Sequence, residues 1–236
     1  MSKLAAYLGP RTPLTPLLEL SHPAPPAGFC CTWIAGDGNP ALFDTPLALE
    51  ADPNIDELAR GLESRLWMTL ARDVAARETR PLYEGELMLL LQGKEAPPPH
   101  LRAALMRHLA PAVELRLNRH SLGEYLLALL QQLLDNDEEM SLDSAILEAL
   151  TLTTRLAGEE EVELNLALSD GERIYLARHS ANCGSLPLHY CTDDERFPDA
   201  QVAASHLPED AAFWHPLPEN HLLILDRDDP PELIPL

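Results

Sequence analysis

The chain has 236 residues, 46% of them hydrophobic, which suits one domain with a packed core over residues 1–236 and excludes a globally disordered chain. Its 38 acidic and 17 basic side chains give a formal net charge of −21, which makes nucleic acid and anionic membranes poor partners. No segment has the composition of a secretory signal or a membrane-spanning helix, so we expect a cytoplasmic protein.

The first ten residues, MSKLAAYLGP, allow two interpretations of Ser2. Removal of Met1 would leave Ser2 with a free α-amine. Such an amine has a pKa of about 8 and can activate the neighbouring hydroxyl as a nucleophile. Alternatively, these residues form an ordinary first strand and Ser2 is its solvated polar end.

The segments up to residue 62 predict a loop, a strand and a helix. Six prolines in residues 10–28 favour an extended surface loop. Residues 28–35, GFCCTWIA, predict a strand before the Gly- and Asp-containing turn at 36–40. A helix is expected to follow, with Asp52 as N-cap and Pro53 at its first position.

The middle of the chain predicts two buried strands and three helices. Residues 65–71 and 86–92 are dense apolar runs, which we expect to be adjacent, central strands. Helices are expected at 98–110, at 121–135 with a capping box of Ser121 and Glu124, and from about Asp143 to Leu156 before Gly158.

The last third of the chain predicts strands. Residues 161–168, EVELNLAL, alternate strictly, and Asp170-Gly171 is expected to turn them into a hairpin with 173–178. Residues 188–191, 201–205 and 221–226 are further strand candidates. The order of strands, then helices, then strands indicates a layered α+β domain.

His179, Cys183, His189 and Cys191 lie close together in the sequence, so a zinc site has to be considered. The segment lacks CxxC or HxxxH spacing, and alternate positions of a hairpin explain it equally well. We therefore expect reduced cysteines, no metal and no cofactor.

Segments spread over nearly the whole chain match the motifs of one family. MSKLAAYLGP resembles M-C-R-L-L-x-Y-L-G, SRLWMTLAR resembles S-R-x-F-L-A-H-V-R, and YEGELMLLLQGKE resembles H-G-x-W-x-F-A-H-N-G. AGFCCTW, SLGEYLLALL and VAASHLPEDAAFWHPLPENHLLILD match further segments. The chain thus resembles the class II glutamine amidotransferases, in the branch that includes the ergothioneine-pathway amidohydrolase. This resemblance implies a four-layer αββα sandwich of the N-terminal nucleophile hydrolase type, with the first residues at the active site.

The resemblance also places the family's catalytic positions on this sequence. Ser2 stands where the family has its cysteine nucleophile, and Gln92-Gly93 stands where it has the Asn-Gly oxyanion hole. Arg72 corresponds to the arginine that binds the substrate carboxylate. Leu122 replaces the aspartate that binds the substrate ammonium.

Other family positions have become apolar. Leu70 and Leu91 replace motif histidines, and Ala27 replaces the aspartate of D-G-F. We expect Leu70, Leu91 and Leu122 to converge near Ser2 and fill the pocket, because buried leucine gains about 2 kcal/mol on leaving water. Arg72 is either a remnant carboxylate receptor or a structural arginine paired with an acidic neighbour such as Asp73 or Glu78.

These replacements predict a protein without glutaminase activity that acts as a scaffold or regulatory subunit beside an active paralogue or a synthase. Two alternatives stay open. One is an N-terminal serine amidohydrolase acting on an apolar amide or a γ-glutamyl substrate. The other is a small-ligand sensor that uses a leucine-lined pocket.

Overall fold

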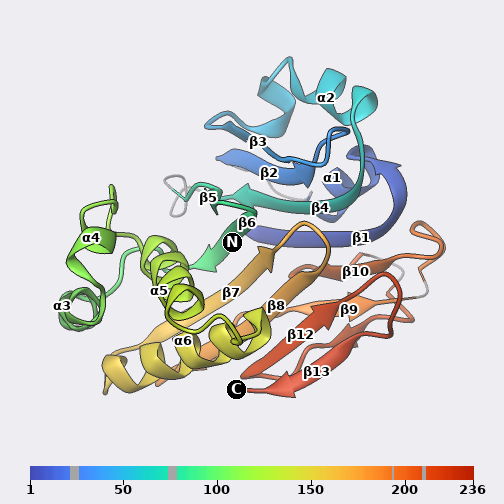
Figure 1. The fold of residues 1–236 in the computed structure, drawn as a ribbon. Coiled ribbons are helices and arrows are strands. Elements are labelled where there is room, and N and C mark those ends of the chain that lie inside the picture. Colours follow the sequence, from blue (N-terminus) through green and yellow to red (C-terminus); the bar gives the residue numbers. More distant parts are fainter. Residues whose placement is uncertain (22–26, 74–78, 193, 209–210) are drawn as a thin grey trace.

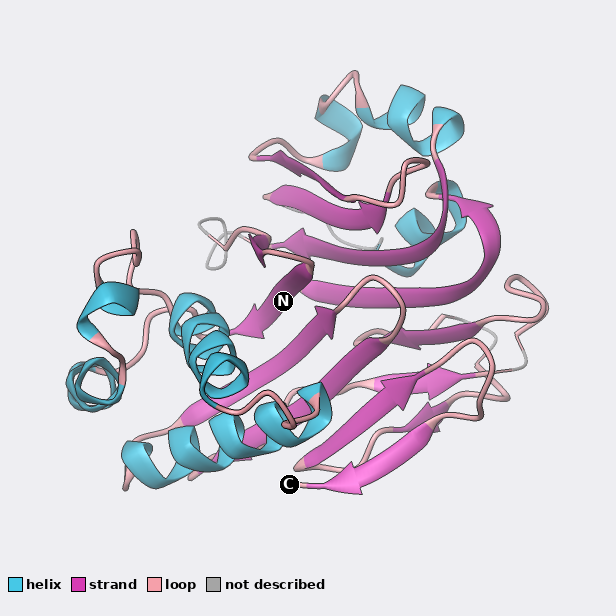
Figure 2. Ribbon diagram, in the orientation of Figure 1, coloured by secondary structure: helices cyan, strands magenta, loops and turns pink. Residues whose placement is uncertain are grey.

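The computed structural model describes residues 1–236 except 22–26, 74–78, 193 and 209–210. Two antiparallel sheets pack face to face, and helices cover their outer faces (Figure 1). Coloured by secondary structure, the strands form the interior layers and the helices the outside (Figure 2). The predicted α+β sandwich of four layers is therefore confirmed.

The first sheet has seven strands and contains the N-terminal strand in its interior. In spatial order its strands are β11 (His215–Pro216), β9 (His189–Cys191), β10 (Gln201–Ala204), β1 (Lys3–Pro13), β4 (Glu63–Arg72), β2 (Gly28–Ile34) and β3 (Pro40–Thr45). Since β1 pairs with β10 on one side and β4 on the other, the start of the chain is held by both neighbours.

The second sheet has six strands and is built mostly from the C-terminal half. In spatial order its strands are β13 (Glu232–Pro235), β12 (His221–Leu225), β8 (Ile174–Ala181), β7 (Val162–Ser169), β6 (Leu87–Gly93) and β5 (Leu82–Glu84). The predicted hairpin at Asp170-Gly171 is present, because β7 and β8 pair from Ser169 and Ile174 onward.

The helices divide between the two outer faces. Those packed on the first sheet are α1 (Thr15–Ser21) and α2 (Ile55–Gly61), the latter preceded by a short 3-10 turn, η1 (Leu49–Ala51). Those associated with the second sheet are α3 (Pro99–His108), α4 (Pro111–Glu114), α5 (Leu122–Asn136) and α6 (Leu142–Ala157).

The two dense apolar runs are buried strands as predicted, but they are not neighbours in one sheet. Strand β4 belongs to the first sheet and β6 to the second. They face each other across the sandwich, where Met68 and Leu70 of β4 share an apolar cluster with Met88 and Leu90 of β6. A strand buried on both faces has the same composition whether its neighbour lies beside it or above it, so the sequence could not decide.

Two predictions for the N-terminal third are wrong in detail. The proline-rich segment 10–28 is not one loop, because β1 continues to Pro13 and α1 follows. The helix expected at Asp52 begins at Ile55, with Asn54 as N-cap. The Asp52 carboxylate instead accepts hydrogen bonds from the backbone and side-chain amides of Asn54, the local turn that aspartate favours.

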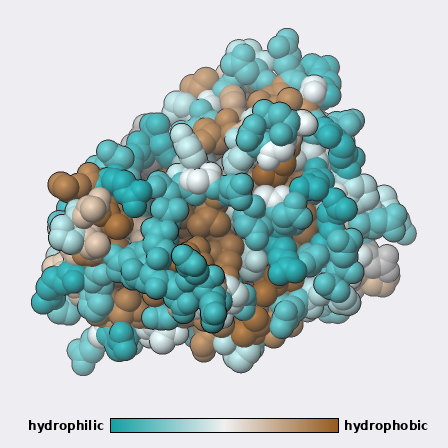
Figure 3. All heavy atoms as spheres, in the orientation of Figure 1, coloured by the Kyte–Doolittle hydropathy of each residue, from teal (hydrophilic) through white to brown (hydrophobic). Residues whose placement is uncertain are grey.

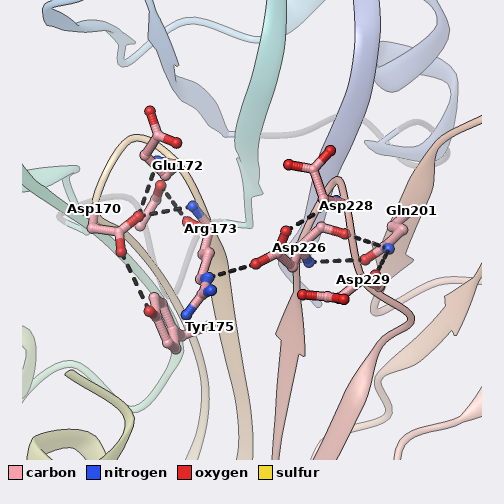
Figure 4. A network of polar contacts seen from close by, with 9 residues as sticks. Asp170, Glu172, Arg173, Tyr175, Gln201, Asp226, Asp228 and Asp229 are labelled. Carbon is pink, nitrogen blue, oxygen red and sulfur yellow. Dashed lines mark hydrogen bonds and ion pairs between the residues drawn. The ribbon is translucent and has the colours of Figure 1, made fainter. Parts of the chain in front are cut away.

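The end of the sandwich where β4 begins is closed by polar contacts between the sheets (Figure 4). Gln201 of β10 donates to the backbone oxygens of Asp226 and Asp229, which follow β12. Arg173 of the β7–β8 turn binds the Asp226 carboxylate at 2.6 Å. The face of the molecule shown in Figure 3 is mostly hydrophilic, with apolar side chains gathered near its middle.

Candidate functional site

A cavity of about 890 Å³ opens at the opposite end of the sandwich, where β1 begins and β4 and β6 end. This volume lies in the range of small-molecule pockets. Its described lining is Met1, Ser2, Asp73, Gln92, Gly93, Lys94, Glu95, Ala96, Pro97, Arg102, Arg119, His120, Ser121, Glu163 and Leu186. Three of the predicted site residues, Ser2, Gln92 and Gly93, are therefore brought together at one cavity.

Ser2 lies at the bottom of this cavity, 7% exposed. Its Oγ accepts a hydrogen bond of 3.1 Å from the backbone N–H of Asp73, the residue after β4. The ammonium of Met1 lies 3.1 Å from the Asp73 carboxylate. With Met1 present, the nitrogen of Ser2 is part of a peptide bond and cannot act as a base.

The side-chain amide of Gln92 is fully used by its neighbours. Its Nε2 donates to the backbone oxygen of Ser2 at 2.5 Å and to Ser205 Oγ at 3.2 Å. Its Oε1 accepts from Asn165 Nδ2 at 2.9 Å. An amide nitrogen has two hydrogens, so no N–H of this side chain is left to stabilise an oxyanion over Ser2.

Gly93 is fixed by its backbone geometry. Its φ is +143°, and a Cβ at this position would lie 2.3 Å from the backbone oxygen of Glu163. The neighbouring strand β7 therefore requires glycine here, quite apart from any role in catalysis.

Arg72 is not among the described residues that line the cavity. It is 2% exposed and donates to the backbone oxygens of Thr45, Thr79 and Phe29. One of its nitrogens lies 2.7 Å from the carboxylate of Asp44 in β3. The acidic partner is thus Asp44 and not Asp73, and Glu78 lies outside the described residues.

The expected convergence of Leu70, Leu91 and Leu122 is wrong. Leu70 lies between the two sheets, whereas Leu91 and Leu122 lie between the second sheet and its helices. Side chains alternate along a strand, so Leu91 must point away from the face that Gln92 occupies. The described part of the cavity lining includes none of these three leucines, so the cavity is neither filled by them nor leucine-lined.

Sequence reasoning missed most of the polar residues around Ser2. Asn165 could have been suspected, since it is a completely buried amide in an otherwise apolar stretch of β7. Ser205, which also accepts a hydrogen bond from the backbone of Leu4, follows β10 without any local signal. The cavity residues Arg102, Arg119 and His120 had no signal either, because the fold alone brings their segments together.

The histidines and cysteines of the 179–191 segment lie in different surroundings. His179 Nε2 is 2.9 Å from the Thr154 hydroxyl on α6. Cys183 donates to the backbone oxygen of Val162, and Cys191 is buried in the core under α1 and α2. Within the described residues, no three acidic, histidine or cysteine side chains come together in a way that could hold a metal ion. Likewise, none of the described helices is long and apolar enough to cross a membrane.

Comparisons with known proteins give a clear result only at the level of structure. No protein-family profile matches the chain, and no curated protein matches it by sequence. A glutamine aminotransferase class II domain protein from Silicibacter pomeroyi superposes with a TM-score of 0.75 at 19% identity, covering 99% of this chain and 98% of that one.

Two further solved structures agree. The glutamine phosphoribosylpyrophosphate amidotransferase from B. subtilis gives a TM-score of 0.62 at 13% identity, and this chain spans only 49% of its length. A predicted glutamine amidotransferase from Pseudomonas aeruginosa gives 0.55 at 14% identity, covering 97% of this chain and 94% of that one. The chain therefore has the N-terminal nucleophile fold of the class II glutamine amidotransferases.

Proposed function

We propose that this protein uses the class II glutamine amidotransferase fold without glutaminase activity, as a cytoplasmic scaffold or regulatory subunit for a partner enzyme. The observation that carries the proposal is the engagement of Gln92. One of its amide hydrogens binds the backbone oxygen of Ser2, just before β1, and the other binds the Ser205 hydroxyl, just after β10, so the amide at the oxyanion position is part of the structure and not of a catalytic site.

The two positions at which the family binds the ends of glutamine do not face the cavity with suitable groups. Both terminal nitrogens of the Arg72 guanidinium are bound by Asp44 and by backbone oxygens, and the side chain is 2% exposed, so it offers no accessible site for a substrate carboxylate. Leu122 packs in the helical layer where an aspartate would be needed for the substrate ammonium. Loss of one charge-assisted hydrogen bond costs on the order of 1.5–3 kcal/mol, and here both ends of the substrate lose theirs.

The retained cavity favours a binding role. A site that had merely decayed would be expected to close as apolar side chains filled it, whereas this one keeps about 890 Å³ and is lined by several charged residues. A partner enzyme, either an active paralogue or a synthase, would supply the chemistry. Affinity capture of the tagged protein followed by mass spectrometry tests this part of the proposal, and repeated recovery of no enzyme would count against it.

Ammonia release from glutamine tests the loss of activity. We expect none from the natural chain and none from Ser2→Cys, because the nucleophile alone restores neither the oxyanion donor nor the substrate contacts. A triple variant with Ser2→Cys, Gln92→Asn and Leu122→Asp serves as the comparison. Activity of Ser2→Cys alone, clearly above that of heat-inactivated protein, would refute the proposal.

One observation favours a second candidate, an N-terminal serine amidohydrolase. Ser2 is one of the residues that line the open cavity, and its Oγ is positioned by the Asp73 N–H. This activity requires a free Ser2 amine as base. Intact-mass measurement distinguishes the two functions: a retained Met1 or a blocked Ser2 excludes the hydrolase, whereas a free Ser2 that reacts with an acylating serine probe supports it.

A further inference from the structure

Basic side chains reach the cavity beside Ser2 from separate parts of the chain. Lys94 follows the end of β6, Arg102 lies in α3, and Arg119 and His120 lie just before α5. The segments are joined directly, since the backbone N–H of Leu122 donates to the backbone oxygen of Glu95 at 2.7 Å. The fold thus gathers these charges at one place.

Lys and Arg make up a larger share of the cavity lining than of the protein as a whole. Three of its 15 described lining residues are Lys or Arg, compared with 17 in all 236 residues. Three acidic residues also line it, Asp73, Glu95 and Glu163, and the first of these is paired with the Met1 ammonium. In a chain with a net charge of −21, a cavity with as many basic as acidic side chains repels anions less than the rest of the surface does.

Two of these basic side chains, those of Arg102 and His120, have nitrogens available to a ligand. The Arg102 side chain makes no hydrogen bond or ion pair with any residue in the described part of the chain. His120 Nδ1 lies 3.0 Å from the Tyr125 hydroxyl, which fixes the ring and leaves Nε2 for a ligand. Lys94, by contrast, is paired with the Glu161 carboxylate at 3.0 Å, so its charge is compensated there.

The positive charge comes from side chains and not from the start of α5. The Ser121 hydroxyl and the Glu124 carboxylate form a capping box there. The same carboxylate also accepts from the backbone N–H groups of Asn118 and Arg119. The Glu124 carboxylate therefore already occupies the N-terminus of α5. An anionic ligand would have to be bound by the side chains of Arg102, Arg119 and His120.

We propose that this cavity binds a small molecule with at least two anionic oxygen groups, phosphates or carboxylates, through Arg102, Arg119 and His120. A guanidinium binds either group through two parallel hydrogen bonds. The inference rests on the proposed non-hydrolytic function, since it names the ligand class of the same cavity. Glutamine, with a single carboxylate, can bind fewer of these three side chains than a ligand with two anionic groups can.

Isothermal titration calorimetry of the full chain tests the proposal with inorganic pyrophosphate, glutarate and glutamine. We expect pyrophosphate or glutarate to bind with a Kd below about 1 mM at low salt and glutamine not to bind. Arg102→Gln and Arg119→Gln should each weaken binding about tenfold. Arg107→Gln, on the same helix as Arg102 but outside the described lining, is the matched control and should leave binding unchanged.

Each outcome decides the proposal. Binding of pyrophosphate alone identifies a phosphate-bearing ligand, and binding of glutarate alone identifies a dicarboxylate. The proposal is overturned if neither compound binds. It is also overturned if Arg102→Gln and Arg119→Gln bind as tightly as the control Arg107→Gln. The melting temperature of each variant shows that it is folded. Ammonia release from glutamine would refute the proposed function, whereas absent anion binding without ammonia release would refute only this inference.

Discussion

Each end of the sandwich has a glutamine that crosses from one sheet to the other, and the two differ in burial. Gln92 of the second sheet reaches Ser2 and Ser205 of the first at the cavity end. Gln201 of the first sheet reaches the backbone of Asp226 and Asp229 of the second at the other end (Figure 4). Gln92 is 2% exposed, whereas Gln201 is only partly buried.

The ion pairs at the two ends differ in the same way. Arg72 and Asp44 at the cavity end are 2% and 17% exposed, whereas Arg173 and Asp226 at the other end are 50% and 19% exposed. Water can replace a lost partner at an exposed pair but not at a buried one. The comparison indicates that the polar residues at the cavity end are the ones on which stability depends.

The largest effect is expected from Arg72→Met. This change leaves the Asp44 carboxylate with only the half-exposed Arg80, 3.5 Å away, and removes a donor from three buried backbone oxygens. Breaking a buried pair on one side costs about 3–5 kcal/mol. Urea unfolding followed by circular dichroism measures the loss. The double variant Arg72→Met, Asp44→Leu should recover part of it, and a loss below about 1 kcal/mol would instead favour a ligand-binding role for Arg72.

The next largest effect is expected from Gln92→Met. Ser2 and Ser205 lose a donor and Asn165 Nδ2 loses an acceptor, all in a buried place, at a cost of about 2–3 kcal/mol. The matched change Gln201→Met should cost about 1 kcal/mol or less, because water reaches its partners. Equal losses for the two variants in the same urea experiment would show that burial does not distinguish the ends.

The sequence predicted those parts of the fold that depend on local patterns. The Ser121–Glu124 capping box starts α5, and the alternation of 161–168 places Val162, Leu164, Leu166 and Leu168 of β7 in the core under the helices. The positions of Ser2, Gln92 and Gly93 at one cavity came from the family resemblance.

Contacts between distant segments were not predictable in this way. Asp44 was missed as the partner of Arg72 because its strand, β3, is short and only partly buried. Whether β4 and β6 lie in one sheet or two depends on pairings with β1 and β7, far away in the chain. The engagement of Gln92 likewise depends on Asn165 and Ser205, which only the folded chain brings near it.

A smaller effect, dependent on pH, is expected from Asp194→Asn. A side-chain hydrogen bond from Arg196, assisted by the Arg196 backbone and the Trp214 indole, lowers the pKa of Asp194 from 3.8 to about 2. The stabilisation is therefore complete above the unfolded pKa of 3.8 and is lost as the pH falls towards about 2. With allowance for the partly exposed guanidinium, the variant should lose about 1–2 kcal/mol at pH 7 and much less at acid pH. An NMR titration that gave Asp194 an ordinary pKa would contradict this.

The smallest effect is expected from Arg173→Gln, and it tests the comparison from the exposed side. The Arg173–Asp226 pair has a short distance of 2.6 Å, which by itself would suggest a strong contribution to stability. Half of the arginine side chain is exposed, however, so water and salt compete for both partners. The loss in urea unfolding should be below about 1 kcal/mol and should disappear in about 1 M salt, where charges are screened within about 3 Å. Arg72→Met should keep nearly all of its effect in the same salt, because ions do not reach the buried pair. A loss of stability for Arg173→Gln as large as that for Arg72→Met would contradict the comparison. It would mean that the contacts in Figure 4 stabilise the packing of the two sheets as much as the buried pair does.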